Sequence, residues 1–253
     1  MTQTTPAHHA PDAFADTAIV MITRNEEGAV AKVVDDARAS APGAEVIVVD
    51  GSSDRTPEIA REHGAVVVAE PGGGPATALV AALQASDRPI IVTIDADDTY
   101  PAPLIPALVE LVRGGFDVAG TDRLAGGRPS TMPFPNYLAN VGFNVLASAR
   151  ALRRIRDVHT GMRAYRREVV HSFAWETEGL ALPVDLIVWP ARAGYRFTEI
   201  PIEYRERVGE TTLVRWPGTT WTIRRIVRPG RPPRASNDGA AHRPTEPSNG
   251  TTT

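Results

Sequence analysis

The chain has 253 residues, of which 42% are hydrophobic, with a formal net charge of −3 and no cysteine. This length suits one sizeable α/β domain, the lack of cysteine excludes disulfides and thiol nucleophiles, and the slightly acidic balance argues against general nucleic-acid binding. No stretch resembles a secretion signal, and no run approaches the roughly 20 apolar residues of a membrane helix. We therefore expect a cytoplasmic protein, or one at the inner face of the cell membrane, whose metal ligands are oxygen or imidazole.

Apolar and amphipathic stretches alternate along the first half of the chain. Residues 1–16 lack apolar periodicity, so a disordered tail is predicted there. Strands are predicted at 18–23, 45–50, 65–69 and 89–95, and helices at 26–39, 56–63 and 76–85. Strands that are apolar on both faces and separated by helices are typical of a parallel sheet covered on both sides. The predicted fold class is α/β: one mostly parallel, Rossmann-like sheet with helices on both faces in a single domain.

The second half is less regular. Helices are predicted at 136–152 and 183–193 and a strand at 196–204, with a polar stretch at 157–165. Residues 213–228 interleave tryptophan and isoleucine with arginine, a pattern that suits either a segment in a membrane interface or a helix packed on the domain. Residues 229–253 are predicted to be a second disordered tail.

Polar residues follow the predicted strands at the edge where parallel sheets bind ligands. Thr23, Asp50 and Asp95 each close an apolar run, and Asp97 and Asp98 come directly after the last of them. Asp95 and Asp97 can converge on one ion at a strand end, and Mg²⁺ or Mn²⁺ takes such carboxylates together with phosphate oxygens and water. The alternative is a solvated acidic turn; Asp98 is expected to cap the following helix.

Five stretches, in order, resemble the motifs of family 2 glycosyltransferases with the GT-A fold. They are AIVMITRNEE, EVIVVDGSSDRT, VTIDADDTYP, DVHTGMRAYRREVV and EIPIEYRERVGETTL, spanning residues 18–213. The pattern is similar to the dolichol- or polyprenyl-phosphate mannosyl- and glucosyltransferases. The resemblance implies a metal-dependent, inverting hexosyltransferase with a nucleotide-sugar half at 17–120 and an acceptor half at 121–212. Its donor would be of the GDP-mannose or UDP-glucose type.

Roles at the donor site come from the same resemblance. The nucleoside pocket would be lined by Thr23, Arg24, Glu26 and Asp50. Asp95 and Asp97 would hold Mg²⁺ or Mn²⁺, with Thr99 as a further ligand where relatives often carry glutamine. Asp157 matches an acidic residue expected near the donor sugar, and His159 is interpreted as a polar residue of the fold.

The acceptor decides which further residues are needed. A polyprenyl phosphate is already ionised and needs only cations, for which Arg123 and Arg207 are the candidates because guanidinium groups bind phosphate with two hydrogen bonds. The alternative for either arginine is a surface ion pair. A hydroxyl acceptor would need a general base, for which Asp185 or Glu178 is the candidate. Asp185 could instead lie on the solvent-exposed face of a helix.

Two other functions fit the same motifs. One is a GT-A glycosyltransferase acting on a hydroxyl of a soluble cell-wall, polysaccharide or natural-product intermediate. The other is a nucleotide-sugar-binding module without catalysis. The chain also departs from the family where relatives often read Gly-x-Ser-Lys-Leu, because Gly209 to Leu213 contain no lysine. A polyprenyl-phosphate acceptor, reached by peripheral membrane association, nevertheless remains the expected partner.

Overall fold

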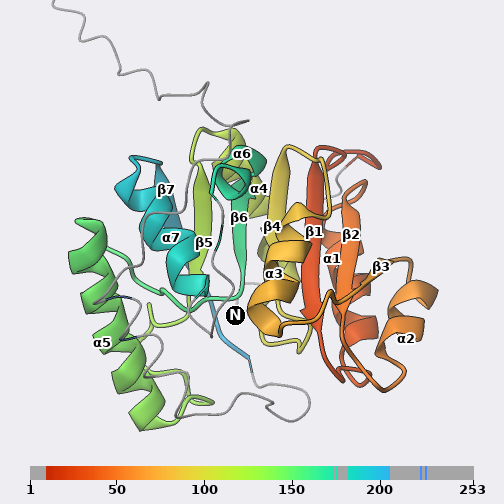
Figure 1. Ribbon diagram of the computed structural model, residues 1–253, viewed down its shortest axis with the longest axis horizontal. Coiled ribbons are helices and arrows are strands. Elements are labelled where there is room, and N and C mark those ends of the chain that lie inside the picture. Colours follow the sequence, from red (N-terminus) through yellow and green to blue (C-terminus); the bar gives the residue numbers. More distant parts are fainter. Residues whose placement is uncertain (1–9, 174, 176–181, 206–222, 224–225, 227–253) are drawn as a thin grey trace, which may run out of the picture.

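The computed structural model describes residues 10–173, 175, 182–205, 223 and 226. Within them one sheet forms the centre of the molecule (Figure 1). Its strands are β1 (Thr17–Thr23), β2 (Glu45–Asp50), β3 (Val66–Ala69), β4 (Ile90–Thr93), β5 (Val118–Asp122), β6 (Arg163–Arg166) and β7 (Phe197–Pro201). They follow the spatial order β3-β2-β1-β4-β6-β5-β7, and β6 alone among them runs antiparallel to its neighbours. The two halves expected from the sequence therefore share one sheet.

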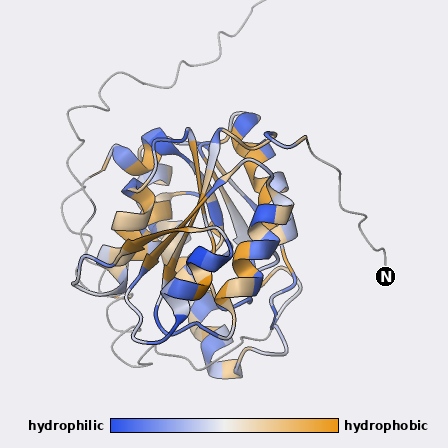
Figure 2. Cartoon of the chain, turned by 90° about the vertical axis from the view of Figure 1, so that its right-hand side faces the viewer, coloured by the Kyte–Doolittle hydropathy of each residue, from blue (hydrophilic) through white to orange (hydrophobic). Residues whose placement is uncertain are grey.

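Helices cover both faces of this sheet. They are α1 (Val30–Ser40), α2 (Thr56–Glu62), α3 (Pro75–Gln84), α4 (Ile105–Arg113), α5 (Phe134–Ala151), α6 (Arg167–His171) and α7 (Leu182–Arg192), with a 3-10 turn at Ala102–Leu104. In Figure 1, α3, α6 and α7 lie in front of the sheet and α1 and α4 behind it. Figure 2 shows the apolar strands between helices with polar outer surfaces.

Alternation along β1 explains the two layers. Ile19 and Met21 enter the core under α1 and α4, whereas Ala18 and Val20 enter the core under α3. All four are at most 1% exposed, as expected for a central parallel strand buried on both faces. A third core joins α5 to α7. The predicted fold class is the observed one.

Several elements differ from those predicted. Helix α1 begins at Val30 instead of residue 26, because the amide of Glu26 donates to Thr56 Oγ1 (2.9 Å) and holds the chain in a turn. Strand β4 ends at Thr93, where the chain turns away before Asp95. Strand β6 was missed, because Arg163 is a buried arginine, 1% exposed, in a stretch that looks polar.

The ordered domain also begins earlier than expected. Phe14 is 1% exposed and packs in the core, and Arg113 both stacks over its ring at 5.2 Å and pairs with Asp16 at 2.6 Å. The prediction of a disordered tail is therefore wrong for residues 11–16, because one aromatic residue in a polar stretch leaves no periodic pattern. The predictions for residues 1–9 and 229–253 lie outside the described residues.

Residues 213–228 are described only at two positions. Ile226 is 4% exposed and packs with Phe143 of α5 and Val188 of α7, whereas Ile223 is 43% exposed. At Ile226 this favours packing on the domain over contact with a membrane. Among the described residues, no helix combines the length and the apolar character that crossing a bilayer requires.

Candidate functional site

The ends of β1 and β2 bring two predicted site residues into direct contact. The hydroxyl of Thr23 donates to Asp50 Oδ1 at 2.7 Å, and the Ser52 hydroxyl donates to the same oxygen at 2.6 Å. The Ser52 amide adds a bond to Asp50 Oδ2 at 3.2 Å. Parallel pairing of Thr23 with Asp50 places both at the same edge of the sheet. The carboxylate is thus fixed at the edge where a ligand would bind.

The loops after these two strands are tied together. Asn25 has φ 58°, a left-handed conformation that asparagine tolerates, and its Oδ1 accepts from the Ser53 amide at 2.9 Å. Its own amide donates to Ser52 Oγ at 2.8 Å. In this loop Arg24 is exposed and Glu26 is half-buried. The four residues predicted for the nucleoside pocket therefore lie at the ends of β1 and β2 and in the loop after β1, which is tied to the loop after β2.

The predicted metal residues lie in one tight turn after β4. Asp97 is 6% exposed, and its Oδ1 accepts from both the hydroxyl (2.6 Å) and the amide (3.2 Å) of Thr99. Asp95 is half-buried and packs against Gly161 from the loop before β6: a Cβ at Gly161 would lie 2.4 to 2.5 Å from the atoms of the Asp95 carboxyl group. The turn thus presents two carboxylates and one hydroxyl oxygen within a few residues. Residues 95–99 are called the metal turn below, after the role predicted for them.

Asp98 does not have the predicted role. The 3-10 turn that follows has Pro101 at its N-cap and no side-chain cap, so the predicted capping role is wrong. Asp98 has φ 58° and forms ion pairs with Lys32 of α1 (2.8 Å) and with Arg205 (3.5 Å). The Arg205 amide also donates to the carbonyl of Thr99 at 3.1 Å. These contacts fasten the metal turn to α1 and to the segment after β7.

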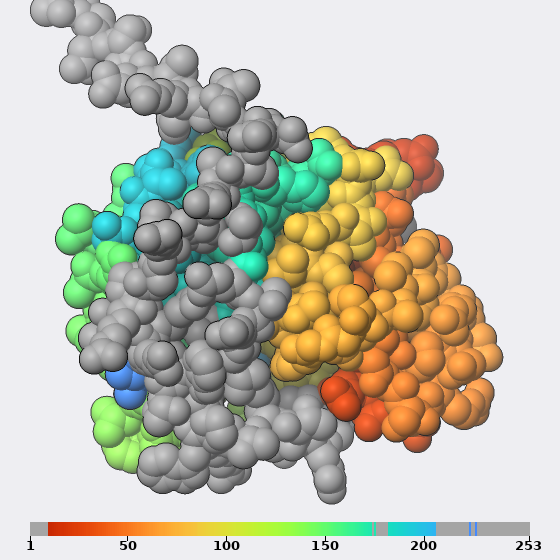
Figure 3. All heavy atoms as spheres, viewed as in Figure 1, coloured from red at the N-terminus to blue at the C-terminus, as the bar shows by residue number. Residues whose placement is uncertain are grey.

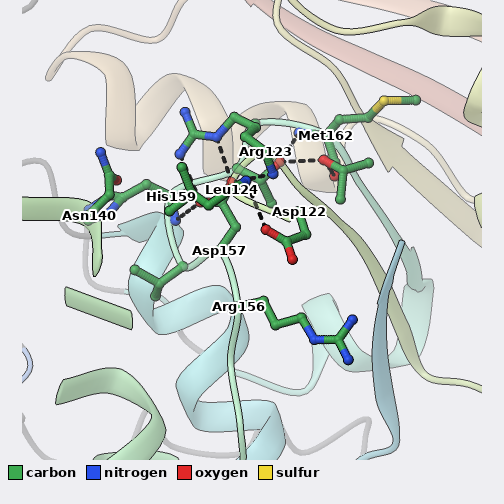
Figure 4. Close-up of polar contacts among 12 residues, drawn as sticks. Asp122, Arg123, Leu124, Asn140, Arg156, Asp157, His159 and Met162 are labelled. Atoms are coloured by element: carbon green, nitrogen blue, oxygen red, sulfur yellow. Dashed lines mark hydrogen bonds and ion pairs between the residues drawn. The ribbon is translucent and has the colours of Figure 1, made fainter. Parts of the chain in front are cut away.

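Arg123 and Asp157 form a buried pair on the other side of the site. Arg123 Nε lies 2.6 Å from Asp157 Oδ2 and Nη2 lies 2.8 Å from Oδ1, and the Arg123 amide adds a third bond at 3.1 Å. The side chains are 9% and 0% exposed. Burial disfavours both charges, yet each partner stabilises the other, which holds the pKa of Asp157 below and the pKa of Arg123 above its usual range. Figure 4 shows Asp122 beside this pair and Arg156 pointing away from it.

Two tyrosines connect the pair with the metal turn. The ring of Tyr204 lies 5.2 Å from the guanidinium carbon of Arg123 and 5.5 Å from the ring of Tyr100, which it meets edge to face. The Tyr204 hydroxyl shares a hydrogen bond with Thr99, and the Tyr100 hydroxyl accepts from the Gly161 amide at 2.7 Å. Burial raises the pKa of both phenols, so both stay neutral.

Neither tyrosine was singled out from the sequence, and the same holds for two acids, the buried Asp122 and the half-buried Glu199. Asp122 closes β5 in the way that Asp50 closes β2, and this repeated pattern is the signal that could have found it. Glu199 accepts the amides of Arg156 (2.8 Å) and Asp157 (2.9 Å), so it shapes the loop that carries Asp157. Burial raises the pKa of Asp122 and of Glu199.

The remaining candidates have different outcomes. Asp185 is 5% exposed in the first turn of α7, so the alternative of a solvent-facing helix position is wrong. Glu178 and Arg207 lie outside the described residues. His159 is half-buried beside Phe143, with ring centroids 5.2 Å apart, and its removal from water lowers its pKa to about 4. At neutral pH this side chain is therefore uncharged.

A groove of about 540 Å³ lies next to the buried pair. It runs between α5 and the loops that follow β5 and α5. Its lining includes Asp122, Leu124, Tyr137, Asn144, Val145 and Arg156. Because Asp122 and Leu124 flank Arg123 in the chain, the groove opens beside the Arg123–Asp157 pair. A ligand with both apolar and polar parts fits this lining.

The donor atoms at the metal turn suit a hard divalent cation. No group of three or more His, Cys, Asp or Glu side chains gathers as a metal site within the described residues. A cation here would thus rest on Asp95 and Asp97, with Thr99, a substrate phosphate and water completing its shell. Mg²⁺ and Mn²⁺ are commonly bound in this way.

Known proteins share much of this sequence. Residues 18–173 match the family model described as Glycosyl transferase family 2. The dolichyl-phosphate hexose transferase of Haloferax volcanii is 45% identical over 216 residues, 85% of this chain and 94% of that protein. The dolichol-phosphate mannosyltransferase of Pyrococcus furiosus is 28% identical over 66% of this chain and 50% of that protein.

A solved structure supports the fold. It is the glucosyl-3-phosphoglycerate synthase of Mycobacterium tuberculosis in complex with Mn²⁺, UDP-glucose and phosphoglyceric acid. It superposes with a TM-score of 0.68 at 22% identity, covering 89% of this chain and 85% of that one. This likeness confirms the predicted α/β architecture.

Proposed function

Because this chain belongs to glycosyl transferase family 2, has the GT-A fold and is therefore a hexosyltransferase, we propose that it transfers a hexose from a nucleotide sugar to a polyprenyl phosphate. The observation that carries the acceptor assignment is the 45% identity to a dolichyl-phosphate hexose transferase over 94% of that protein. The carboxylates at the carboxyl ends of β2 and β4 supply the site for the donor.

The donor is assigned to the joined loops after β1 and β2 and to the turn after β4. Thr23, Arg24, Glu26 and Asp50 would contact the nucleoside, and Asp50 is already oriented by Thr23 and Ser52. Asp95 and Asp97 would hold a divalent cation, aided by the Thr99 hydroxyl. When bound, such a cation neutralises charge on the diphosphate. The solved relative with Mn²⁺ and UDP-glucose supports this assignment.

The reaction needs no general base when the acceptor is a phosphate. A phosphate oxygen of the acceptor attacks the anomeric carbon, the bond from that carbon to the diphosphate breaks, and the nucleoside diphosphate leaves. Attack from the face opposite the leaving group inverts the anomeric configuration. What the chain must supply is position and positive charge.

Arg123 supplies that position indirectly. Its Nε and Nη2 donate to Asp157, so the two hydrogen bonds predicted for a substrate phosphate are formed within the protein instead. We assign Arg123 to holding Asp157 and the loop up to Gly161 in place beside Asp95. Arg207 remains the candidate for direct contact with a phosphate.

One alternative keeps structural support. Asp185 is a buried carboxylate at the start of α7, and such a group suits a general base for a hydroxyl acceptor. In that case the enzyme would glycosylate a soluble intermediate. The relatives from Haloferax, Pyrococcus and Mycobacterium give no support to a module without catalysis, because each is named for transfer or synthesis.

The test is a transfer assay with paired acceptors. Purified protein, Mn²⁺ and either GDP-mannose or UDP-glucose are incubated with a short-chain polyprenyl phosphate or with the matching polyprenol. We expect one donor to give a glycosyl phosphate lipid and the polyprenol to give no product. Equal or preferred use of hydroxyl acceptors would contradict the proposal.

A further inference from the structure

Helix α5 carries apolar side chains on the face that points away from the core. Phe134, Leu138 and Val145 are 61%, 60% and 64% exposed and lie about one and two turns apart, so they form one stripe. The buried residues Phe143 and Ala147 lie on the opposite face. A surface helix of a soluble domain normally carries charged or polar residues on its outer face. The stripe of Phe134, Leu138 and Val145 contains no charged or polar residue.

The position of α5 leaves this stripe accessible. Figures 1 and 3 show α5 at the edge of the molecule, beyond α7. Leu146 (39% exposed) and Leu152 (85% exposed) extend the apolar surface along the helix to its C-terminus. Several exposed apolar side chains on one helix mark a contact with a protein or a membrane.

The charge around the helix distinguishes a membrane partner from a protein partner. Residues 123–156 contain six arginines and no Asp, Glu or Lys, although the whole chain carries a formal charge of −3. Apart from the paired Arg123 and from Arg128, they gather around Leu152 at the end of α5: Arg150, Arg153, Arg154 and Arg156. Arg153, Arg154 and Arg156 are exposed. The apolar stripe therefore ends in a cationic cluster.

We propose that the outer face of α5 is a docking surface for an anionic lipid bilayer. The stripe of Phe134, Leu138 and Val145 would enter the boundary between head groups and acyl chains, while the arginines meet anionic head groups. A second copy of the chain would match the stripe, but its own segment 123–156 offers no carboxylate to the arginines. The stripe consists of residues other than 213–228, the segment for which the sequence left membrane contact and packing on the domain as alternatives.

Docking in this orientation would bring a lipid acceptor to the site, a point that rests on the proposed function. Val145 belongs to the exposed stripe and also lines the groove, whose other wall includes Asp122 and Leu124. The groove therefore leads from the proposed bilayer surface to the residues flanking Arg123. A polyprenyl phosphate could reach the site without leaving the membrane.

Vesicle flotation with the full chain tests the docking surface. The probes are phosphatidylcholine vesicles with and without 30% phosphatidylglycerol, at low and at high salt. We expect binding only to the anionic vesicles and weaker binding at high salt. The variant Arg153→Gln should lose about fivefold in partitioning and Phe134→Ser/Leu138→Ser about tenfold or more; none of these residues lines the groove.

A matched control comes from the opposite edge of the sheet. Val66 and Val68 of β3 are 52% and 41% exposed, so Val66→Ser/Val68→Ser removes apolar surface away from α5 and should leave vesicle binding unchanged. The proposal would be overturned if vesicle binding did not depend on lipid charge or were unchanged in both variants. It would also be overturned if the wild type did not bind vesicles but formed a dimer in solution, and if the variant with serine in the apolar stripe were monomeric. Transfer to a short-chain acceptor in solution should persist in the α5 variants, which separates failure of docking from failure of the proposed function.

Discussion

Arg123 and Asp157, 34 positions apart in the sequence, are joined by two side-chain hydrogen bonds of 2.6 and 2.8 Å in the interior of the protein. The pair connects the end of β5 with the loop that carries Gly161. Because Gly161 packs against Asp95, the pair holds the loop against which the metal turn packs. Stability and donor binding should therefore both depend on it.

Breaking the pair should destabilise the fold. Asp157→Asn leaves the Arg123 charge buried without its partner, and we expect a loss of about 3 kcal/mol or more in the free energy of unfolding, measured in urea. The double variant Arg123→Met/Asp157→Leu should lose less free energy of unfolding than the sum of the losses measured for Arg123→Met and Asp157→Leu alone. Glu110→Gln, which removes an exposed partner of Arg113, is the control and should cost less than about 1 kcal/mol. A comparable small loss for Asp157→Asn would refute the structural role.

Gly161→Ala should impair donor binding more than folding. The new methyl group would lie 2.4 to 2.5 Å from the Asp95 carboxyl atoms, so that side chain must rotate away from its position. We expect Mn²⁺-dependent donor affinity, measured by calorimetry, to fall about tenfold or more, because orientation of a metal ligand is lost. Gly126→Ala is the control, since a Cβ there meets nothing within 4 Å. Unchanged affinity in Gly161→Ala would show that Asp95 is not held for a metal.

His159 should make the protein less stable in mild acid. Burial keeps its pKa near 4 in the folded state, against 6.5 in the unfolded chain. As the pH falls from about 6.5 to 4, the unfolded chain takes up a proton that the folded chain does not, so the free energy of unfolding decreases by on the order of 3 kcal/mol.

The variant His159→Asn isolates this effect. Urea titrations at pH 7, 6 and 5 should show a shallower loss of stability in the variant than in the wild type. Parallel pH profiles would mean that His159 titrates normally in the folded protein.

Asp185→Asn discriminates between the two acceptor classes. The substitution keeps the shape of a residue that is 5% exposed but removes its basicity. With a phosphate acceptor we expect turnover within about tenfold of the wild type, because no proton has to be removed. A loss of 10² to 10⁴, the usual contribution of a general base, would instead support a hydroxyl acceptor. The circular dichroism spectrum of the variant should match that of the wild type.

Much of the sheet could be predicted from local pattern. The bounds of β2 are those predicted, and β1 differs by one residue, because continuous apolar runs ending in polar residues mark central parallel strands. Strand β6 could not be found in this way. Its Arg163 is buried because its guanidinium donates to the carbonyls of Pro183 and Val158, partners that are set by tertiary structure.

The site was predictable where it depends on strand ends. Thr23 and Asp50 meet because parallel strands in register bring their carboxyl ends together. The partners of Asp98 and Arg123 were not predictable, because both are engaged by residues distant in the chain. The sequence predicted that Arg123 binds a substrate phosphate, with a surface ion pair as the alternative. In the fold Arg123 forms a buried ion pair with Asp157.

Calorimetric titration of the nucleotide-sugar donor shows whether Asp95 and Asp97 hold a metal that binds the donor. The variant Asp95→Asn/Asp97→Asn is compared with Asp35→Asn/Asp36→Asn, which removes the same charge from α1, with Mn²⁺ present and absent. We predict that Mn²⁺ strengthens donor binding in the wild type and in the α1 variant, and that this gain falls at least about 100-fold in the Asp95/Asp97 variant. An equal Mn²⁺-dependent gain in all three proteins would mean that Asp95 and Asp97 do not hold the metal.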